Sequence, residues 1–241
     1  MIKKTIQRFK NLPNRIFRKI GFEIKKVEKR TVNKNDLSRL SQFVINNQPV
    51  KLHFGCGPRV LKGWVNIDLA FEPFEDYLQY YTDIHYPENI RGDRNDFYEI
   101  NFLKTGLPLL DDSVDVIFHE DFFEHLTQKE QVVFLAETLR VMKKGSTHRI
   151  NTPNLLASMR DNSNFRKGRE GVFTDEWENW HHFSIVTPAI LEEMAKMVGY
   201  SDIKFNAKNN SVVADLLPRE YRPDEKDRPA RDSNVFADLI K

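Results

Sequence analysis

The sequence predicts an α/β fold in which helices cover both faces of a mostly parallel, seven-stranded sheet. Short apolar runs alternate along the chain with stretches whose apolar residues repeat at helical spacing, which is typical of strands joined by helical crossovers. The chain of 241 residues is 40% hydrophobic and 30% charged, a composition typical of globular proteins. Its length suits one large domain, which we expect to span residues 35–241.

Seven short apolar runs are the predicted strands. They cover residues 50–54, 65–68, 97–102, 114–119, 147–151, 203–207 and 235–240. Two longer stretches, residues 71–96 and 155–183, fit no element well. Long irregular segments inside an α/β domain are usually functional lids or disordered insertions, so we expect insertions at both places.

Capping signals predict the two best-marked helices. Thr127 and Glu130 form a T-x-x-E capping box at the start of one helix. Gly145, which follows two lysines, is the expected C-cap of the same helix. A second helix begins at Thr187, which is followed by proline, and stops at Gly199. Both helices carry apolar residues on one face, which we expect to pack on the sheet.

The first 34 residues form a basic, amphipathic segment. Eleven Lys and Arg stand against two acidic residues within residues 1–30, and apolar residues recur there at helical spacing. A solvated tail fits this composition, and so does a helix that lies on an anionic membrane surface. We predict reversible peripheral membrane contact through residues 1–30. A further helix, with Asn35 and Asp36 as candidate caps, would lead into the domain.

Composition also limits the class of protein. The single cysteine, Cys56, excludes an internal disulfide and any multi-cysteine metal site. No apolar run reaches the roughly 18 residues of a membrane-spanning helix, and no secretory signal is visible. We therefore expect a cytoplasmic protein, at most peripheral to the inner face of the membrane. Asp111, Asp112 and Asp115 fit a turn before a strand, and we assign no metal site.

The most informative stretch is "KLHFGCGPRVLKGWVNIDL", residues 51–69. Gly55 and Gly57 follow an apolar strand, where glycines let the backbone turn sharply and approach a ligand closely. Alone, these glycines would also fit a tight turn. Asp68 ends the next apolar run, where a carboxylate can accept hydrogen bonds from both hydroxyls of a ribose. In an open α/β sheet, both positions would lie at the carboxyl edge, where ligands bind.

The spacing of these residues excludes two common nucleotide sites. A dinucleotide fingerprint needs a third glycine where Val60 stands and an acidic residue about twenty positions further on. A phosphate-binding P-loop needs G-K-[ST], which does not follow. The remaining ribose-bearing candidate is S-adenosylmethionine, which has no phosphates and so needs no long glycine-rich cradle.

Six motifs in order resemble the class I S-adenosylmethionine-dependent methyltransferases. The motifs are "HFGCGP", "WVNIDL", "LPLLDDSVDVIFHEDFFEHL", "LRVMKKG", "RINTPN" and "HHFSIVTPAILEEMAKMVGY". The chain is most similar to the type-11 group often associated with bacterial surface-polysaccharide biosynthesis, over about residues 50–207 and the final strand. The resemblance implies a Rossmann-like fold and a reaction that produces S-adenosylhomocysteine.

The resemblance also implies which residues bind the cofactor. Gly55 and Gly57 would face its methionine part, Asp68 would bind the ribose, and Asn101 would lie near the adenine. The full implied set is Phe54, Gly55, Cys56, Gly57, Asp68, Leu69, Asn101, Phe102 and His119. Only ten residues, 55–64, join the first two strands, so the usual crossover helix must be short.

Methyl transfer to a hydroxyl needs a group that removes its proton. The candidates for this base are His119, Asp121, His181 and His182, since the histidines titrate nearest neutral pH and the last two lie in an aromatic stretch that could cover the site. Each could instead be structural. The pair Glu124 and His125 matches a common motif of the group, and we expect it to be structural.

We predict O-methylation of a sugar or glycan-linked hydroxyl in surface-polysaccharide biosynthesis. RNA methylation is the alternative enzymatic function, in which the basic N-terminus would bind RNA phosphates. No RNA-binding module is recognisable, however, and nucleic acid is not the expected partner. A binding or scaffold protein that keeps the fold without turnover is the non-enzyme alternative. Cofactor binding without transfer would distinguish it.

Overall fold

The computed structural model describes residues 33–71, 84–158, 176–178, 180–222 and 234–241. The chain divides into two units, Met1–Val32 and Asn33–Lys241, and every described residue belongs to the second. The predicted membrane contact through residues 1–30 therefore lies outside the described residues and stays a prediction. So do the interiors of both predicted insertions, at residues 72–83 and 159–175.

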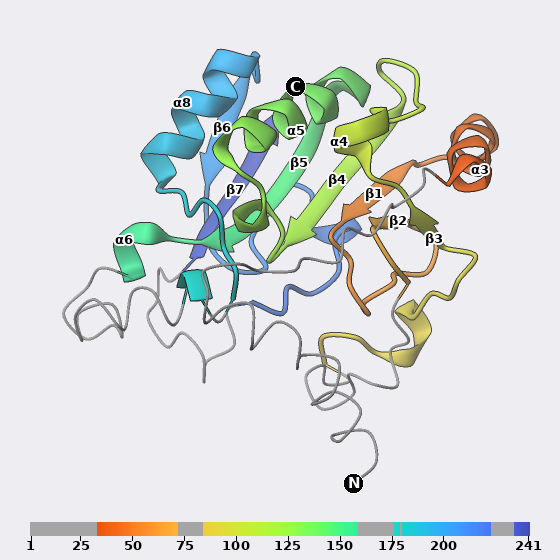
Figure 1. The fold of residues 1–241 in the computed structure, drawn as a ribbon, viewed down its shortest axis with the longest axis horizontal. Helices are drawn as coiled ribbons and strands as arrows, with labels where there is room; N and C mark the ends of the chain where they lie inside the picture. Colours follow the sequence, from red (N-terminus) through yellow and green to blue (C-terminus); the bar gives the residue numbers. More distant parts are fainter. Residues whose placement is uncertain (1–32, 72–83, 159–175, 179, 223–233) are drawn as a thin grey trace, which may run out of the picture. The chain divides into compact units, whose positions relative to one another are not determined.

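The domain is built on one seven-stranded sheet, and all seven predicted strands are present (Figure 1). The strand order is β3-β2-β1-β4-β5-β7-β6; β1 to β5 run parallel, while β7 is antiparallel to both β5 and β6. The strands are β1 Lys51–Phe54, β2 Val65–Asp68, β3 Phe97–Glu99, β4 Val114–Glu120, β5 Met142–Pro153, β6 Asp202–Phe205 and β7 Asn234–Ile240. This confirms the predicted mostly parallel α/β fold.

Helices follow the strands as the sequence predicts. The α-helices of the described residues are α3 Lys34–Asn46, α4 Phe102–Thr105, α5 Gln128–Val141, α6 Leu155–Ser158 and α8 Pro188–Val198. Short 3-10 helices are η2 Glu88–Ile90, η3 Phe123–His125 and η6 Ala214–Leu216. The capping box of Thr127 and Glu130 is present at α5, and Gly199 caps α8 in the left-handed conformation, so both predicted signals are confirmed.

Several predicted element boundaries were wrong, and so was the expected short crossover helix. Helix α5 ends at Val141, because Met142 already pairs with Val114 in the sheet, and Gly145 is a left-handed residue within β5. Helix α3 is capped by Asn33, whose side chain accepts from the backbone N–H of Asp36. Strand β3 stops at Glu99 because α4 begins at Phe102. Residues 55–64 contain no helix at all: they turn back directly from β1 to β2.

The two faces of the sheet are covered differently. One face carries the main apolar core, in which side chains of α4, α5 and α8 pack on the strands. On the other face, Val116 and Phe118 of β4 pack against Leu61, Trp64 and Tyr86, which come from loops. Among the described residues this second cover comes from loops, from Ile90 of η2, and from Val213 and Leu217 on either side of η6. The ten-residue connection from β1 to β2 leaves no room for a crossover helix.

Arg149 is buried on this second face and ties three segments together. Its Nε donates to Glu220 Oε1 at 2.7 Å, and its Nη1 lies 3.3 Å from Asp238 Oδ1 of β7. Its Nη2 donates to the backbone oxygen of Ala207 at 2.9 Å. Charges with this degree of burial need paired and hydrogen-bonded partners, and Arg149 has both. The chain after β6 is thereby held against the centre of the sheet.

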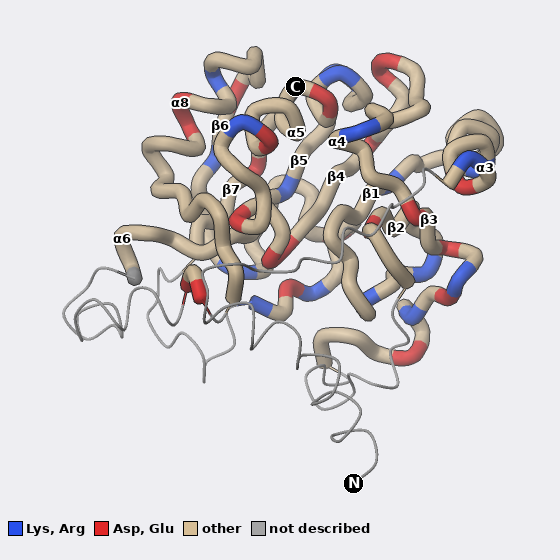
Figure 2. The backbone as a smooth tube through the Cα atoms, in the orientation of Figure 1, with Lys and Arg blue, Asp and Glu red and all other residues tan. Residues whose placement is uncertain are grey.

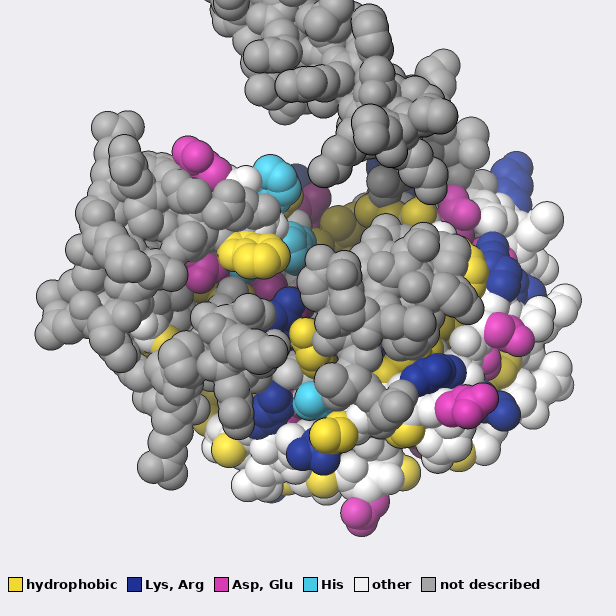
Figure 3. All heavy atoms as spheres, turned by 90° about the horizontal axis from the view of Figure 1, so that it is seen from below, with side chains coloured by type: hydrophobic (Ala, Val, Ile, Leu, Met, Phe, Trp, Pro, Cys, Tyr) yellow, Lys and Arg dark blue, Asp and Glu magenta, His cyan; other side chains and the backbone are white. Residues whose placement is uncertain are grey.

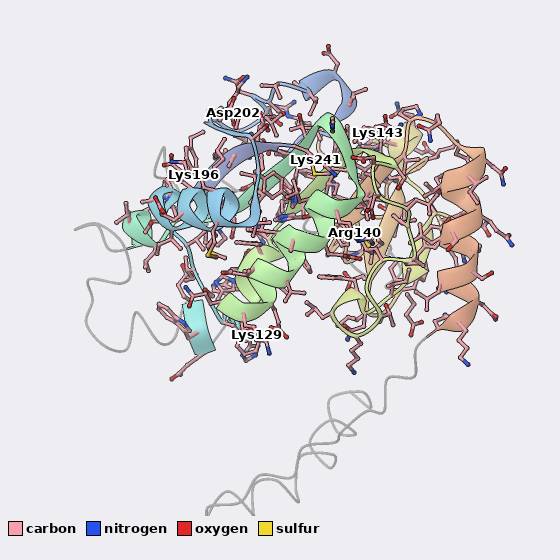
Figure 4. The ribbon with its side chains drawn as sticks, turned by 90° about the horizontal axis from the view of Figure 1, so that it is seen from above. Lys129, Arg140, Lys143, Lys196, Asp202 and Lys241 are labelled. Atoms are coloured by element: carbon pink, nitrogen blue, oxygen red, sulfur yellow. The ribbon has the colours of Figure 1, made fainter. Side chains whose placement is uncertain are left out.

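The amino edge of the parallel strands carries paired charges. Arg140, Lys143 and Lys241 lie near one another around the C-terminus (Figure 4). Each pairs with an aspartate of the predicted acidic turn, and the pairs are Arg140 with Asp111 at 2.8 Å, Lys143 with Asp115 at 2.8 Å and Lys241 with Asp112 at 2.9 Å. These aspartates thus serve structural ion pairs at the edge opposite the predicted cofactor loop.

Charged residues concentrate outside the central strands (Figure 2). Acidic and basic residues alternate along the connection from η2 to β3, where Arg94 pairs with Asp36 of α3. Asp36 also accepts from the backbone N–H of Glu99 at 2.8 Å, so it links α3 to the outer strand. No helix in the described part of the chain is long and apolar enough to cross a membrane.

Three histidines lie inside the sheet core: His53, His119 and His148. Burial lowers the pKa of His53 and of His148 to about 3, with the Arg59 charge adding to the effect at His53, and burial lowers the pKa of His119 well below its usual value. All three are therefore neutral in the folded protein at neutral pH, while in the unfolded chain they would titrate near pH 6.5.

We predict that acid destabilises the fold through these histidines. Their stability contribution is complete above about pH 6.5 and is lost as the pH falls toward the lowered pKa values, because only the unfolded chain takes up the protons. Three such groups reduce the free energy of unfolding by about 4 kcal/mol for each pH unit below 6.5. Urea unfolding at pH 7.5, 6.5 and 5.5 measures the slope.

His119→Leu is the matched variant for this experiment, because it keeps an apolar side chain of similar size and removes one titrating group. Its slope should be about one third shallower. Equal stability at all three pH values in the parent protein would show that these histidines are not buried as described.

Candidate functional site

The candidate site lies at the carboxyl ends of the parallel strands, along the lower edge of the sheet in Figure 1. The strand order reverses between β1 and β4, and open α/β sheets bind ligands where this reversal separates the following loops. The loops after β1, β2 and β4 meet there. Figure 3 looks onto this edge, where histidine, acidic and hydrophobic side chains gather together on one side.

The loop after β1 approaches the loop after β4 so closely that only glycine fits. Gly55 has φ +59°, and a Cβ placed on it would stand 2.7 Å from Cβ and Cγ of Phe122. Gly57 has φ +48°, but the space around its missing Cβ is open among the described residues. Gly55 is thus required by packing and by backbone geometry, whereas Gly57 leaves the backbone accessible at the point where a ligand could approach.

Asp68 is fixed at the end of β2 by this same loop. Its Oδ2 accepts from the backbone N–H of Gly57 at 2.9 Å, and its Oδ1 accepts from the N–H of Leu69 at 2.6 Å. The half-buried carboxylate therefore has a defined orientation beside the open face of Gly57. The structure brings together the three residues that the sequence motif predicted to act together.

The other predicted cofactor residues divide into buried and accessible ones. The rings of Phe54 and Phe102 pack against Phe122 and Phe134 in the main core, so they support the loops. Cys56 is buried beside Val60 and Phe97. Leu69 is exposed and Asn101 is half-buried. Asn101 occupies the position before α4, just beyond β3, and its side chain makes no capping hydrogen bond to that helix.

His119 does not suit a role at the reacting atoms. It is fully buried on the α5 side of β4, between Phe122, Phe123 and Phe134, and neither ring nitrogen has a hydrogen-bond partner among the described residues. A base must reach the proton that it removes. The prediction that His119 borders the cofactor and acceptor overlooked the alternation of β4, which directs this side chain into the core.

Glu120, the next residue, points to the opposite face and holds a loop under the site. It pairs with buried Arg59, and its Oε2 accepts from the backbone N–H groups of Tyr221 at 2.9 Å and Arg222 at 3.2 Å. Burial raises the pKa of Glu120 to about 7, and the charge of Arg59 opposes that rise. Arg59 also donates to the backbone oxygen of His85 at 2.8 Å, so this pair joins four separate segments.

Asp121 stands at the mouth of the site in a left-handed conformation, with φ +50°. Its carboxylate accepts a hydrogen bond from Arg222 Nε, and its backbone N–H donates to Asn151 of β5 at 3.2 Å. Arg222 therefore already engages this carboxylate in an ion pair. Asp121 is thus at the predicted place, but in an ion pair that the sequence did not reveal.

The predicted histidines 181 and 182 differ sharply in environment. His182 is buried, and its Nδ1 lies 2.7 Å from Glu176 Oε2. His181 is exposed and has φ +56°. It stands between Trp180 and Phe183, whose side chains are 52% and 67% exposed. Of the predicted base candidates, His181 is the accessible histidine.

The structure also joins Glu124 and His125, which the sequence predicts to be structural, to the predicted base candidate His182. Ligand-type atoms of Glu124, His125 and His182 lie within 4.8 Å of one another. The rings of His125 and His182 meet edge to face at 4.9 Å between centroids. The motifs "FFEHL" and "WHHF" contain these residues, but the sequence could not show that η3 and the segment before α8 come together.

Residues 69–150 match a family model of the type-11 methyltransferases, which is described as "Methyltransferase domain". The matched segment begins at the end of β2 and includes β3, β4, α5 and most of β5, and it therefore contains the loop after β4 that borders the site. The match covers about a third of the chain. No curated protein matches the sequence.

Solved structures with a similar fold are distant in sequence. A SAM-dependent methyltransferase from Archaeoglobus fulgidus is 16% identical with a TM-score of 0.47, covering 85% of this chain and 92% of that one. One from Thermotoga maritima, described as a possible histamine N-methyltransferase, is 13% identical with a TM-score of 0.48, covering 86% and 89%.

A putative methyltransferase of Haloferax volcanii, solved in complex with the Trm112 activator, is 18% identical with a TM-score of 0.44, covering 86% of this chain and 87% of that one. These likenesses are too distant to indicate what this chain acts on. The family-model match is therefore the finding that bears on activity, and it indicates a methyltransferase domain within residues 69–150.

Proposed function

We propose that the enzyme O-methylates a hydroxyl of a sugar or of a glycan-linked group. The observation that carries the proposal is the segment 180–183, in which two exposed aromatic side chains flank the exposed His181 at the edge of the site. Aromatic rings pack against the C–H face of a sugar ring, while a few polar groups orient its hydroxyls.

The charges described at this edge favour an uncharged acceptor over a phosphate backbone. Arg59 is buried against Glu120, and Arg222 is paired with Asp121, so these two guanidinium groups are already engaged by carboxylates. Affinity for RNA depends on cations that displace counterions from phosphates. A cytoplasmic enzyme that modifies surface glycans before their export is the cellular setting that we propose.

The cofactor, in this proposal, lies across the loops after β1 and β2. The methionine part would approach the backbone at Gly57, where the space is open, and the ribose hydroxyls would donate to the oriented carboxylate of Asp68. The sulfonium would then face the loop after β4, because Phe122 packs directly on Gly55. Asn101, beyond β3, would lie near the adenine.

Transfer requires the acceptor oxygen to align with the methyl–sulfur bond and to lose its proton. The oxygen forms a bond to the methyl carbon, the carbon–sulfur bond breaks with its electron pair left on sulfur, and S-adenosylhomocysteine departs. We assign the proton transfer to His181, which is exposed beside the two aromatic rings. Asp121 is the weaker candidate because Arg222 holds its carboxylate.

We predict that Asp68→Asn weakens S-adenosylhomocysteine binding tenfold to a hundredfold. The substitution removes one charged acceptor, which corresponds to about 1.5–3 kcal/mol. Calorimetry on the purified protein measures the dissociation constant. Asp93→Asn, at an exposed position outside the site, is the matched control and should bind normally. Unchanged affinity in Asp68→Asn would remove the ribose assignment.

We predict label transfer from S-adenosylmethionine to sugars when nucleotide sugars, glycans, lipids and RNA are compared. His181→Ala should then lower turnover by about 10²- to 10⁴-fold and leave S-adenosylhomocysteine affinity unchanged, because a base acts on the acceptor and not on the cofactor. Transfer to RNA alone would reject the acceptor class. Normal turnover by His181→Ala would reject the assigned base.

A further inference from the structure

We propose that Glu124, His125 and His182 bind a divalent transition-metal ion at the acceptor side of the site. Their candidate ligand atoms lie within 4.8 Å of one another, although the residues come from η3 and from the segment before α8. Two imidazoles and one carboxylate form a ligand set that is common at open metal sites of enzymes. This set lies outside the cofactor loop and outside the acidic turn of residues 111–115.

Neighbouring side chains orient two of the three ligands as they would at a metal site. His182 Nδ1 lies 2.7 Å from Glu176 Oε2, which fixes a tautomer with the proton on Nδ1 and directs Nε2 toward Glu124. Thr152 Oγ1 donates to Glu124 Oε2 at 2.9 Å. Carboxylate–histidine and hydroxyl–carboxylate contacts of this kind commonly support metal ligands.

The spacing between these ligands suits an ion better than a direct hydrogen bond. His182 Nε2 lies 3.9 Å from Glu124 Oε1, beyond hydrogen-bonding distance. An ion with bonds of about 2.0–2.2 Å would hold such atoms about 3–4 Å apart. His125 is exposed, so its side chain can turn by the small amount needed to complete the set.

The backbone holds the two segments together independently of any ion. The backbone N–H groups of Phe183 and Ser184 both donate to the backbone carbonyl oxygen of Glu124, at 2.8 and 3.2 Å. Gln131 Nε2, from α5, donates to the backbone carbonyl oxygens of Phe123 and Ser184 at 2.9 and 3.1 Å. Ligands supported in this way lose little freedom on binding a metal, which favours a site over a chance cluster.

Nitrogen ligands indicate zinc, manganese, iron or cobalt in preference to magnesium or calcium, which favour oxygen. Three protein ligands leave at least one position for water or for an acceptor oxygen. In the second case, which rests on the proposed function, the ion would lower the pKa of the bound hydroxyl and so ease the transfer of its proton to His181 before the oxygen attacks the methyl carbon. The site would then contribute directly to acceptor activation.

The test is metal binding by the full chain, without an affinity tag and after treatment with a chelator. Calorimetry with Zn²⁺ and the visible absorption of added Co²⁺ should both show one equivalent bound. His125→Ala and His182→Ala should each weaken Zn²⁺ binding at least tenfold. His181→Ala removes a neighbouring exposed histidine outside the cluster, and it should bind Zn²⁺ within twofold of the parent protein.

Glu176→Gln keeps all three ligands and tests the orienting contact, with an expected loss of about 10- to 100-fold. Circular dichroism establishes that each variant is folded. A parent protein that binds neither ion saturably, or folded His125→Ala and His182→Ala variants with full affinity, would overturn the proposal. These readouts need no acceptor, so a failed metal site and a failed acceptor assignment remain distinguishable.

Discussion

The close approach of two loops at the reversal of strand order is the constraint on which the site depends. Strands β1 and β4 are neighbours in the sheet; after β1 the chain continues to β2 on one side, and after β4 it continues to β5 on the other side. The loops after them nevertheless touch where Phe122 packs on Gly55, because a residue without a Cβ makes room for the ring. Gly57 and Asp68 lie in and beside the same loop and are linked by a hydrogen bond. In the proposed function, the cofactor and the group that receives the methyl therefore meet at this edge of the sheet.

The absence of a helix from residues 55–64 is offset by buried charges. Where a crossover helix would cover the sheet with apolar side chains, Arg59 enters from the loop and pairs with Glu120 at the end of β4. Glu120 in turn accepts backbone hydrogen bonds from Tyr221 and Arg222, while Arg149 holds Glu220. Buried ion pairs add little net stability, but breaking one is costly, so they specify where a segment must lie. Here they place residues 219–222 beneath the site, with Arg222 next to Asp121.

Local sequence patterns were sufficient to predict the sheet, the starts of α5 and α8, and the glycine loop that meets Asp68. Period-two and helical spacing, the capping box at Thr127 and the glycines before Asp68 are all local signals, and each identified its element. The end of α5 was wrong because pairing of Met142 with Val114 is a long-range interaction that outweighed the glycine signal at position 145. His119 was misjudged for a related reason, since the direction of a side chain at a strand end depends on the register of the whole sheet.

Contacts between distant segments were beyond reach of the sequence. Nothing near "FFEHL" indicates that His182 lies beside Glu124, and nothing near Asp121 indicates Arg222. Such pairs depend on how loops of different length fold over the carboxyl edge. These contacts therefore had to be taken from the structure, whereas the meeting of Gly55, Gly57 and Asp68 could be predicted from the sequence.

A structure of the protein with S-adenosylhomocysteine bound tests the central claim most directly. The account predicts that both ribose hydroxyls lie within hydrogen-bonding distance of Asp68, with the amino-acid part over Gly57 and the sulfur toward the loop after β4. A nucleoside bound away from the ends of β1 and β2, or an Asp68 carboxylate directed away from the ribose, would contradict it.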